Sequence, residues 1–153
     1  MMNPFSSRCC QHNHTAGWVY YAESSWMATP DDGLVAQLYT EGSVKAKVGK
    51  GEEVSVHETT HYPFDDQINF TIHTQKAVSF PLYLRIPEWC KQAVVKVNDR
   101  VITIHADTGN YIRLMTRWKN GDKISLQLPM ELKVSQWDAN KNRGSVNYGP
   151  LTY

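Results

Sequence analysis

The sequence has little of several features that would assign it to a protein class directly. It carries only three cysteines in 153 residues, its net charge is +1, and no apolar run is long enough to cross a bilayer. A charge so close to zero gives no field that would attract nucleic acid or an anionic membrane. Three cysteines, two of them adjacent, make a poor disulfide framework. We therefore expect no nucleic-acid partner and no membrane partner, and the cysteines leave the redox compartment open.

The chain also lacks a signal-peptide pattern, a fixed-period repeat and a low-complexity tract. Its first residues, Met1-Met2-Asn3-Pro4-Phe5, contain no apolar stretch of the kind that a signal peptide needs. The length is sufficient for one ordinary domain with a sizeable core. If the sequence is part of a larger protein, the missing signal does not bear on that protein, so the localisation stays unassigned.

The most unusual segment that is present is Arg8-Cys9-Cys10-Gln11-His12-Asn13-His14. Adjacent cysteines rarely pair with each other, because the peptide between them must distort to satisfy disulfide geometry. They can instead supply two soft ligands to one metal ion, or one ligand and one reactive thiolate. Buried or incidental thiols are the alternative interpretation. Few residues precede the cysteine pair, so little of the sequence before it could help to form a pocket. This indicates that the chain belongs to a larger protein.

Three polar residues follow the cysteine pair, and each has two interpretations. His12 and His14 would complete a metal site of the type Cys-Cys-x-His-x-His, and the protein would then be a metal binder. Otherwise they are polar residues near a pocket or on the surface. Asn13 would either contact a substrate or cap a helix that begins near Thr15.

Residues 15–27 predict one helix rich in aromatic residues, before the spacing of the apolar residues changes. The helical stripe consists of Trp18, Tyr21, Ala22 and Trp26. At this spacing we expect the aromatics to pack against a partner surface and not to form a sugar-stacking platform. The segment Thr29-Pro30-Asp31-Asp32-Gly33 then predicts a turn.

From Gly33 onward, apolar residues recur with a period of two. About ten short strands follow at spacings of roughly eight to twelve residues, which is typical of an all-β sandwich. Asn98-Asp99 predicts a tight hairpin turn between two of them. The fold class is therefore mainly β, an antiparallel and jelly-roll-like sandwich that follows one short helix.

The remaining chemistry-bearing residues are interpreted structurally. Cys90 ends an apolar strand and is expected to be a small core residue. Trp137 and Tyr148 are expected to be core or edge aromatics of the last strands. Turn positions, where aspartate is favoured by local hydrogen bonds, account for the acidic residues Asp31, Asp32, Asp65, Asp66 and Asp107.

Several segments, taken in order, resemble the β-L-arabinofuranosidases of glycoside hydrolase family 127. The resemblance rests on Arg-Cys-Cys-Gln-His-Asn at 8–13, Gly-Trp-Val-Tyr-Tyr-Ala-Glu at 17–23, Trp-Met-Ala-Thr-Pro-Asp-Asp-Gly-Leu at 26–34, His-Tyr-Pro-Phe-Asp-Asp at 61–66, Phe-Pro-Leu-Tyr-Leu-Arg-Ile-Pro-Glu-Trp-Cys at 80–90, Trp-Lys-Asn-Gly-Asp at 118–122, Leu-Pro-Met at 128–130 and Gly-Pro-Leu-Thr-Tyr at 149–153. Each segment is weak by itself, and their order makes the resemblance specific.

The resemblance implies a division of the chain into two parts. Members of this family have an (α/α)6 barrel that carries the active site, followed by β-sandwich domains. Residues 1–28 would then be a remnant of the catalytic barrel, with the cysteine pair and its last helix. Residues 29–153 would be the β-sandwich domain, and the chain would be the C-terminal portion of a larger enzyme.

The resemblance also implies roles for the cysteine pair. In the family, one glutamate and three cysteines hold a zinc ion, so Cys9 and Cys10 would be zinc ligands and Cys9 the nucleophile. The other ligands and the acid/base glutamate would lie upstream. We therefore expect a Zn²⁺ cofactor in the parent enzyme, no tightly bound zinc in this chain, and no activity of the chain alone. L-arabinofuranoside-containing glycans would be the substrate.

The sandwich also supports a function from another class. Sandwiches joined to glycosidases often bind carbohydrate or serve as structural modules without catalysis, and a fold alone does not decide between these roles. A homodimer formed through the sandwich is one form of the structural role. Binding of glycans in calorimetric titrations would separate the two.

Overall fold

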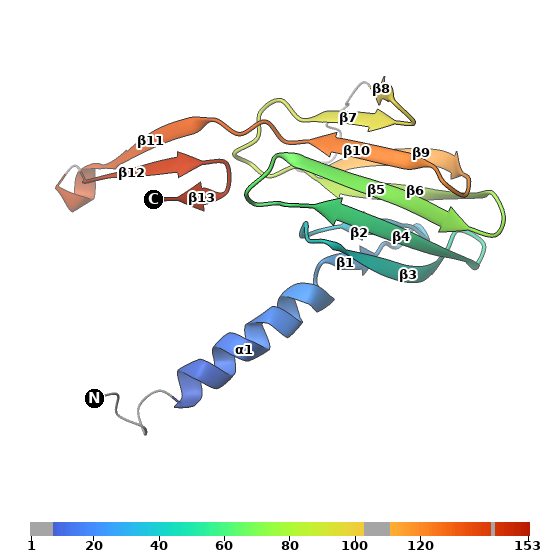
Figure 1. The fold of residues 1–153 in the computed structure, drawn as a ribbon, viewed down its shortest axis with the longest axis horizontal. Coiled ribbons are helices and arrows are strands. Elements are labelled where there is room, and N and C mark those ends of the chain that lie inside the picture. The colour runs from blue at the N-terminus through green and yellow to red at the C-terminus, as the bar shows by residue number, and fades with distance from the viewer. Residues whose placement is uncertain (1–7, 103–110, 142) are drawn as a thin grey trace.

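The computed structural model describes residues 8–102, 111–141 and 143–153, with the side chains of residues 8–12 and Asn140 outside its described part. Within these residues, one α-helix precedes a series of thirteen strands (Figure 1). The elements are α1 (Arg8–Glu23), β1 (Trp26–Ala28), β2 (Leu34–Ala36), β3 (Gly42–Val48), β4 (Glu52–Thr60), β5 (Gln67–Thr74), β6 (Val78–Arg85), β7 (Val94–Val97), β8 (Arg100–Ile102), β9 (Tyr111–Trp118), β10 (Lys123–Gln127), β11 (Leu132–Trp137), a 3₁₀ turn (Asp138–Asn140), β12 (Arg143–Tyr148) and β13 (Leu151–Thr152).

The strands form three sheets, two of which pack into a sandwich. The four-stranded sheet has the order β1-β2-β6-β9, and the six-stranded sheet has the order β3-β4-β5-β10-β7-β8. All pairings within the sandwich are antiparallel except that between β2 and β6, which is parallel. The mainly β fold with one short N-terminal helix is the one predicted from the sequence.

The core lies between the inner faces of these two sheets because every second residue points inward. In β4, Val54, Val56, Glu58 and Thr60 are buried, whereas the residues between them are more exposed. The largest fully buried side chain is Trp118, whose indole Nε1 donates to the carbonyl oxygen of Phe80 at 3.0 Å. Burial of this large ring therefore leaves no polar atom unpaired.

The hairpin predicted at Asn98-Asp99 is present between β7 and β8. Both residues have positive φ, 48° and 65°, as a two-residue turn with left-handed central residues requires. The turn predicted at Asp107 lies outside the described residues.

The predicted helix is displaced toward the N-terminus. It begins at Arg8 and ends at Glu23, not at Met27. Trp26 lies in β1, opposite Ala36 of β2, and its ring packs edge-on against Phe70 with the centroids 5.8 Å apart. The prediction that Trp26 belongs to a helical stripe was therefore wrong. Sheet pairing and burial against Phe70 outweigh the helical periodicity of the sequence.

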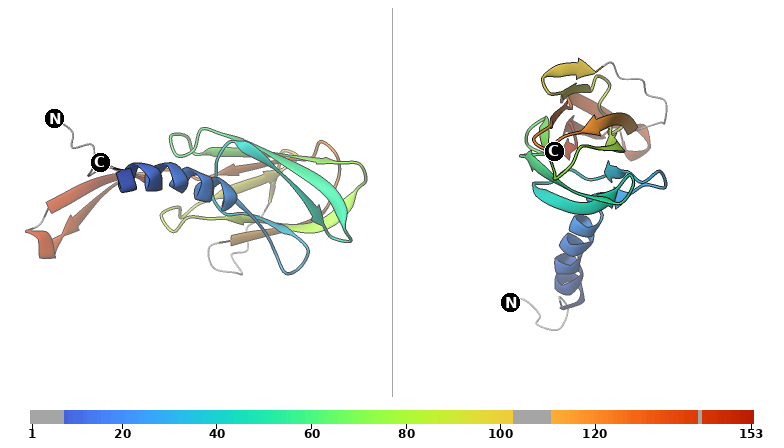
Figure 2. Two further views of the ribbon diagram at one scale, coloured as in Figure 1. Left: turned by 90° about the horizontal axis from the view of Figure 1, so that it is seen from below. Right: turned by 90° about the vertical axis from the view of Figure 1, so that its right-hand side faces the viewer.

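The last three strands form a separate antiparallel sheet of order β11-β12-β13. Like α1, it extends away from the sandwich in Figure 1 and in the left-hand view of Figure 2. Trp137 is 62 % exposed and Tyr148 39 % exposed, so neither is a core aromatic of the sandwich. The sequence predicted these strands but not their separation from the main sheets. Within the described residues, no helix has the length and apolarity needed to span a bilayer.

Candidate functional site

The cysteine pair lies in the first turn of α1, where Cys9 and Cys10 follow Arg8. Their side chains, like that of His12, are outside the described part of the structure, so their predicted roles stay predictions. The described residues contain no group of three or more histidine, cysteine, aspartate or glutamate side chains that could hold a metal ion.

The residues that follow the pair continue the helix. Asn13 lies inside α1 and not at its start, so the alternative in which it caps the helix was wrong, and the contact to substrate stays a prediction. The ring of His14 is exposed and meets Trp18 edge-on, with the ring centroids 6.3 Å apart. His14 thus stands one helical turn before an exposed indole on the same helix face.

Helix α1 is joined to the sandwich through its last turn. The hydroxyl of Tyr21 donates to the carbonyl oxygen of Tyr39 at 3.1 Å. The residues before it are largely exposed: Trp18 at 67 %, Val19 at 56 % and Tyr20 at 66 %. The helix therefore carries the cysteine pair away from the sandwich and leaves most of its aromatic surface uncovered.

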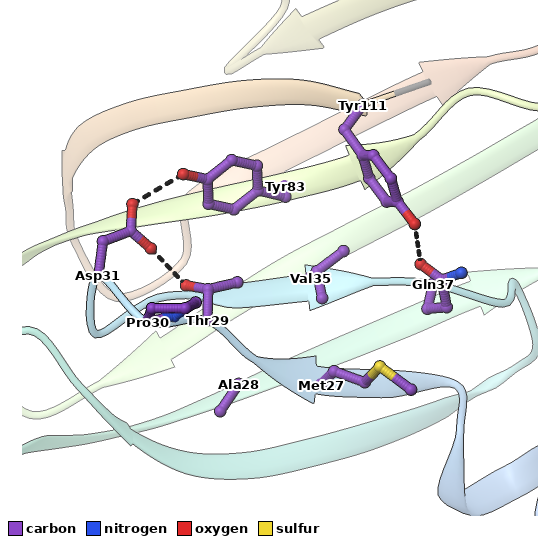
Figure 3. A pocket seen from close by; sticks show the side chains of 9 residues that line it. All are labelled: Met27, Ala28, Thr29, Pro30, Asp31, Val35, Gln37, Tyr83 and Tyr111. Carbon is purple, nitrogen blue, oxygen red and sulfur yellow. Dashed lines mark hydrogen bonds between the residues drawn. The ribbon is translucent and has the colours of Figure 1, made fainter. Parts of the chain in front are cut away.

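A shallow groove lies on the outer face of the four-stranded sheet. It has a volume of about 560 Å³, within the range of roughly 300–1,000 Å³ typical of small-molecule sites. Residues from β1, β2, β6, the start of β9 and the turn after β1 line it: Met27, Ala28, Thr29, Pro30, Asp31, Val35, Gln37, Tyr83 and Tyr111 (Figure 3). The two tyrosines lie on the neighbouring strands β6 and β9, one toward each end of the groove, and Val35 of β2 pairs with Tyr83.

At one end of the groove, Asp31 is the centre of a hydrogen-bond network. Its carboxylate accepts from the hydroxyl of Thr29 at 2.5 Å and from that of Tyr83 at 2.7 Å. Arg113 donates from Nε to the Tyr83 hydroxyl oxygen at 2.9 Å and lies 3.5 Å from the Asp31 carboxylate. These hydrogen bonds, first that of Thr29 and then that of Tyr83, lower the pKa of the Asp31 carboxyl, so it is ionised at neutral pH.

At the other end, the hydroxyl of Tyr111 donates to the side-chain oxygen of Gln37 (Figure 3). The amide nitrogen of Gln37 has no hydrogen-bond partner among the described residues, so its two N–H donors remain available. The groove thus has an apolar floor with two fixed tyrosine rings and an amide donor at its edge.

Sequence reasoning placed Asp31 correctly in a turn but missed the groove. Tyr83 is 52 residues away from Asp31 in the chain, and only the pairing of β2 with β6 brings them together. The available signal was the alternation in β6, where Tyr83 stands between the buried Leu82 and Leu84. That pattern predicts an outward-facing aromatic ring, although not its neighbours.

The third cysteine has the structural role that the sequence predicted. Cys90 is 6 % exposed and belongs to the hydrophobic core. Burial raises the pKa of its thiol, which disfavours the reactive thiolate. Cys90 is therefore a suitable control residue for experiments on Cys9 and Cys10.

Solved structures of glycoside hydrolases resemble this chain over nearly all of its length. A GH127 β-L-arabinofuranosidase from Geobacillus stearothermophilus T6 is 27 % identical with a TM-score of 0.88, over 97 % of this chain and 24 % of its own. A second structure, described as a glycoside hydrolase, is 25 % identical with a TM-score of 0.85, over 96 % of this chain and 25 % of its own.

A GH127 β-arabinofuranosidase shares the fold at 23 % identity and a TM-score of 0.72, over 81 % of this chain and 22 % of its own. The chain thus spans about a quarter of the length of these proteins. No curated protein matches it. The sequence profile of the GH127 β-L-arabinofuranosidase middle domain matches residues 33–130. On this match, which covers the sandwich from β2 to β10, the chain belongs to the GH127 β-L-arabinofuranosidase family.

Proposed function

We propose that this chain is a segment of a longer β-L-arabinofuranosidase that hydrolyses L-arabinofuranoside-containing glycans with retention of configuration. The observation that carries the proposal is the family match at residues 33–130, with the Cys9-Cys10 pair on the helix that precedes it. In this proposal, residues 1–28 belong to a helical catalytic domain apart from β1, which pairs with β2 in the sandwich, and residues 29–153 belong to the sandwich. The exposed aromatics of α1 support it, because large uncovered apolar surfaces commonly mark sites of interaction.

Cys9 is the proposed nucleophile, and Cys9 and Cys10 are proposed ligands of a zinc ion. Thiolates are among the preferred ligands of Zn²⁺, so the chemistry of the pair fits the metal. Two thiolates make only half of a tetrahedral site, and the remaining ligands would come from residues outside this chain. When bound, zinc would keep the thiols deprotonated at neutral pH.

The proposed reaction is a double displacement. The sulfur of Cys9 attacks the anomeric carbon, and a C–S bond forms as the C–O bond to the leaving group breaks. A carboxylic acid of the longer protein gives its proton to the leaving oxygen. Water then attacks the same carbon, loses a proton to that carboxylate and releases the thiolate. Retaining glycosidases normally use a carboxylate as nucleophile, and here the cysteine would replace it.

Hydrolysis of a nitrophenyl β-L-arabinofuranoside tests the proposal. We expect the longer protein to release nitrophenol and Cys9→Ser to lower kcat by roughly a thousandfold or more, because a serine hydroxyl is not ionised at neutral pH. We expect no release by the 153-residue chain alone, because it lacks the acid/base residue and the other zinc ligands that the family resemblance places upstream.

The matched control is Cys90→Ala, which removes a thiol buried in the sandwich core. It is expected to retain activity as long as the protein folds. A longer protein in which Cys9→Ser leaves kcat unchanged would remove the nucleophile assignment.

The alternative is a non-catalytic sandwich that binds carbohydrate or serves as a structural or dimerisation module. The groove on the four-stranded sheet favours the binding role, since fixed tyrosine rings over an apolar floor suit a sugar face. A homodimer through the sandwich stays a prediction, and sedimentation of the purified chain at several concentrations would test it.

A further inference from the structure

The groove on the outer face of the four-stranded sheet has a structure that is fixed before any ligand binds. Met27 of β1, Val35 of β2 and Tyr83 of β6 lie side by side, because Met27 pairs with Val35 and Val35 with Tyr83 in the sheet register. Strand pairing thus sets the distances between the residues that form the floor of the groove. A site built on sheet strands is more rigid than one built on loops.

The Tyr83 ring is held from two sides. Its hydroxyl donates to Asp31 and accepts from Arg113, whose guanidinium carbon also lies 5.9 Å from the centroid of the ring. A ring that is already fixed loses little conformational entropy when a ligand stacks on it. Asp31 is in turn held by Thr29, so the turn after β1 and the strand β6 are locked together.

The charges of the groove cancel. Asp31 is the only ionised side chain among its lining residues, and it is paired with Arg113 at 3.5 Å. A phosphate or uronate group would find no unpaired cation there, and a strongly basic ligand would have to compete with Arg113. The lining therefore favours a neutral ligand.

The chemical groups of the groove match those of a sugar ring. Sugars present C–H faces that stack on aromatic rings and hydroxyls that bond to amides at the rim. The rings of Tyr83 and Tyr111 supply the first kind of contact, and the amide nitrogen of Gln37 supplies the second.

We propose that the groove between Tyr83 and Tyr111 binds a neutral oligosaccharide. This binding does not involve Cys9 and needs no hydrolysis. It rests on the proposed function only for the choice of probe, an arabino-oligosaccharide, because the parent enzyme would act on glycans that contain L-arabinose.

The test is titration of the 153-residue chain with arabino-oligosaccharide, followed by calorimetry and by amide NMR shifts. We expect saturable binding that shifts the signals of Val35 and Gln37. Tyr83→Ala should weaken binding by about tenfold or more, which is the loss expected when one stacked ring is removed. Tyr83→Phe should weaken it less, because the ring remains while its hydroxyl bonds are lost.

The matched control is Phe64→Ala, which removes an aromatic ring that is 80 % exposed on the loop between β4 and β5. It is expected to leave binding unchanged. Should Tyr83→Ala fail to fold, Gln37→Ala replaces it, with a smaller expected loss. The absence of binding, binding of acidic pectic oligosaccharides alone, or equal binding by the groove variants and the wild type would each overturn the proposal. Nitrophenol release by the longer protein would be unaffected by these results, so the two proposals fail separately.

Discussion

At the scale of single residues, Glu58 is the most unusual ionisable group of the sandwich. Its side chain is fully buried on the inner face of β4. One carboxyl oxygen accepts from the backbone N–H of Thr40 at 3.0 Å, and the other has no hydrogen-bond partner among the described residues. Burial raises the pKa of this carboxyl to about 8, and the Thr40 N–H and the Trp26 indole offset only part of that effect.

Because this pKa is raised, we expect the unfolding free energy to fall as the pH rises. The folded chain holds a proton on Glu58 up to about pH 8, whereas the unfolded chain releases it near the usual value of 4.5. The contribution of Glu58 to the unfolding free energy is therefore greatest below pH 4.5 and is lost progressively as the pH rises to about 8. We expect Glu58→Gln, which cannot ionise, to raise the unfolding free energy relative to wild type more at pH 8 than at pH 5, by up to a few kcal/mol.

Urea unfolding at the two pH values measures this difference. The control is Glu53→Gln on the same strand, which removes an exposed partner of Lys45 at 2.9 Å. Its effect should be small and nearly the same at both pH values. An equal effect of Glu58→Gln at pH 5 and pH 8 would contradict the account of the buried carboxyl.

What the sequence shows of single residues depends on whether their partners are near in the chain. The alternation Val54, Val56, Glu58 already places Glu58 on an inward face of a strand. The core position of Cys90 was predicted from its place at the end of an apolar segment and from the usual burial of free cysteines. The network of Asp31 with Tyr83 and Arg113 was not, because the partners become neighbours only through the pairing of strands that are distant in sequence.

At the scale of elements, strands were predicted more accurately than the helix. Regular alternation identified most strands of the sandwich, because one face of each is buried. The helix was misplaced at both ends, since Asn13 and Gly17 are weak helix formers and Trp26 continues the helical spacing by chance. The two serines after Glu23 mark the true end, where the Ser25 hydroxyl donates to the carbonyl oxygen of Ala22 at 2.7 Å.

The turn between β1 and β2 depends on Gly33. A Cβ atom at this position would lie 2.2 Å from the carbonyl oxygen of Pro81 on β6 and 2.8 Å from Thr29 Oγ1. Because one of these contacts is with backbone, the strand itself would have to move. We expect Gly33→Ala to lower the unfolding free energy by about 1–3 kcal/mol, as overpacking does, and also to weaken oligosaccharide binding.

Thermal or urea unfolding of Gly33→Ala provides the measurement. The matched control is Gly42→Ala at the start of β3, where an added Cβ atom would meet no atom within 4 Å. This variant should be as stable as the wild type or slightly more stable, since alanine restricts the unfolded chain. Equal stability of the two variants would show that the β2–β6 approach is not tight.

At the scale of the whole molecule, the mainly β class and the family could be predicted from sequence, but the grouping of strands into sheets could not. The parallel pair β2–β6 and the central place of β10 between β5 and β7 follow from non-local packing. The small sheet β11-β12-β13 was predicted only as further strands. Its apolar face is uncovered, with Leu132 at 74 % and Val134 at 72 % exposure.

Helix α1 and the small sheet β11-β12-β13 are both joined to the sandwich with much apolar surface exposed. This is consistent with the proposal that further domains of a longer glycosidase cover them. The chain spans 24 % of the length of the Geobacillus stearothermophilus enzyme, which leaves ample length for such domains. The central claim is then that α1 brings Cys9 into the active site of the longer glycosidase proposed for this chain.

Mass spectrometry of a covalent sugar adduct tests this claim most directly. The longer protein would be treated with an activated β-L-arabinofuranosyl fluoride that forms the glycosyl-enzyme faster than water releases it, and then digested. One pentosyl unit is expected on the peptide that contains Cys9 and Cys10, attached to Cys9, and none on the same peptide of Cys9→Ser. An adduct on a carboxylate, or one that persists in Cys9→Ser, would contradict it.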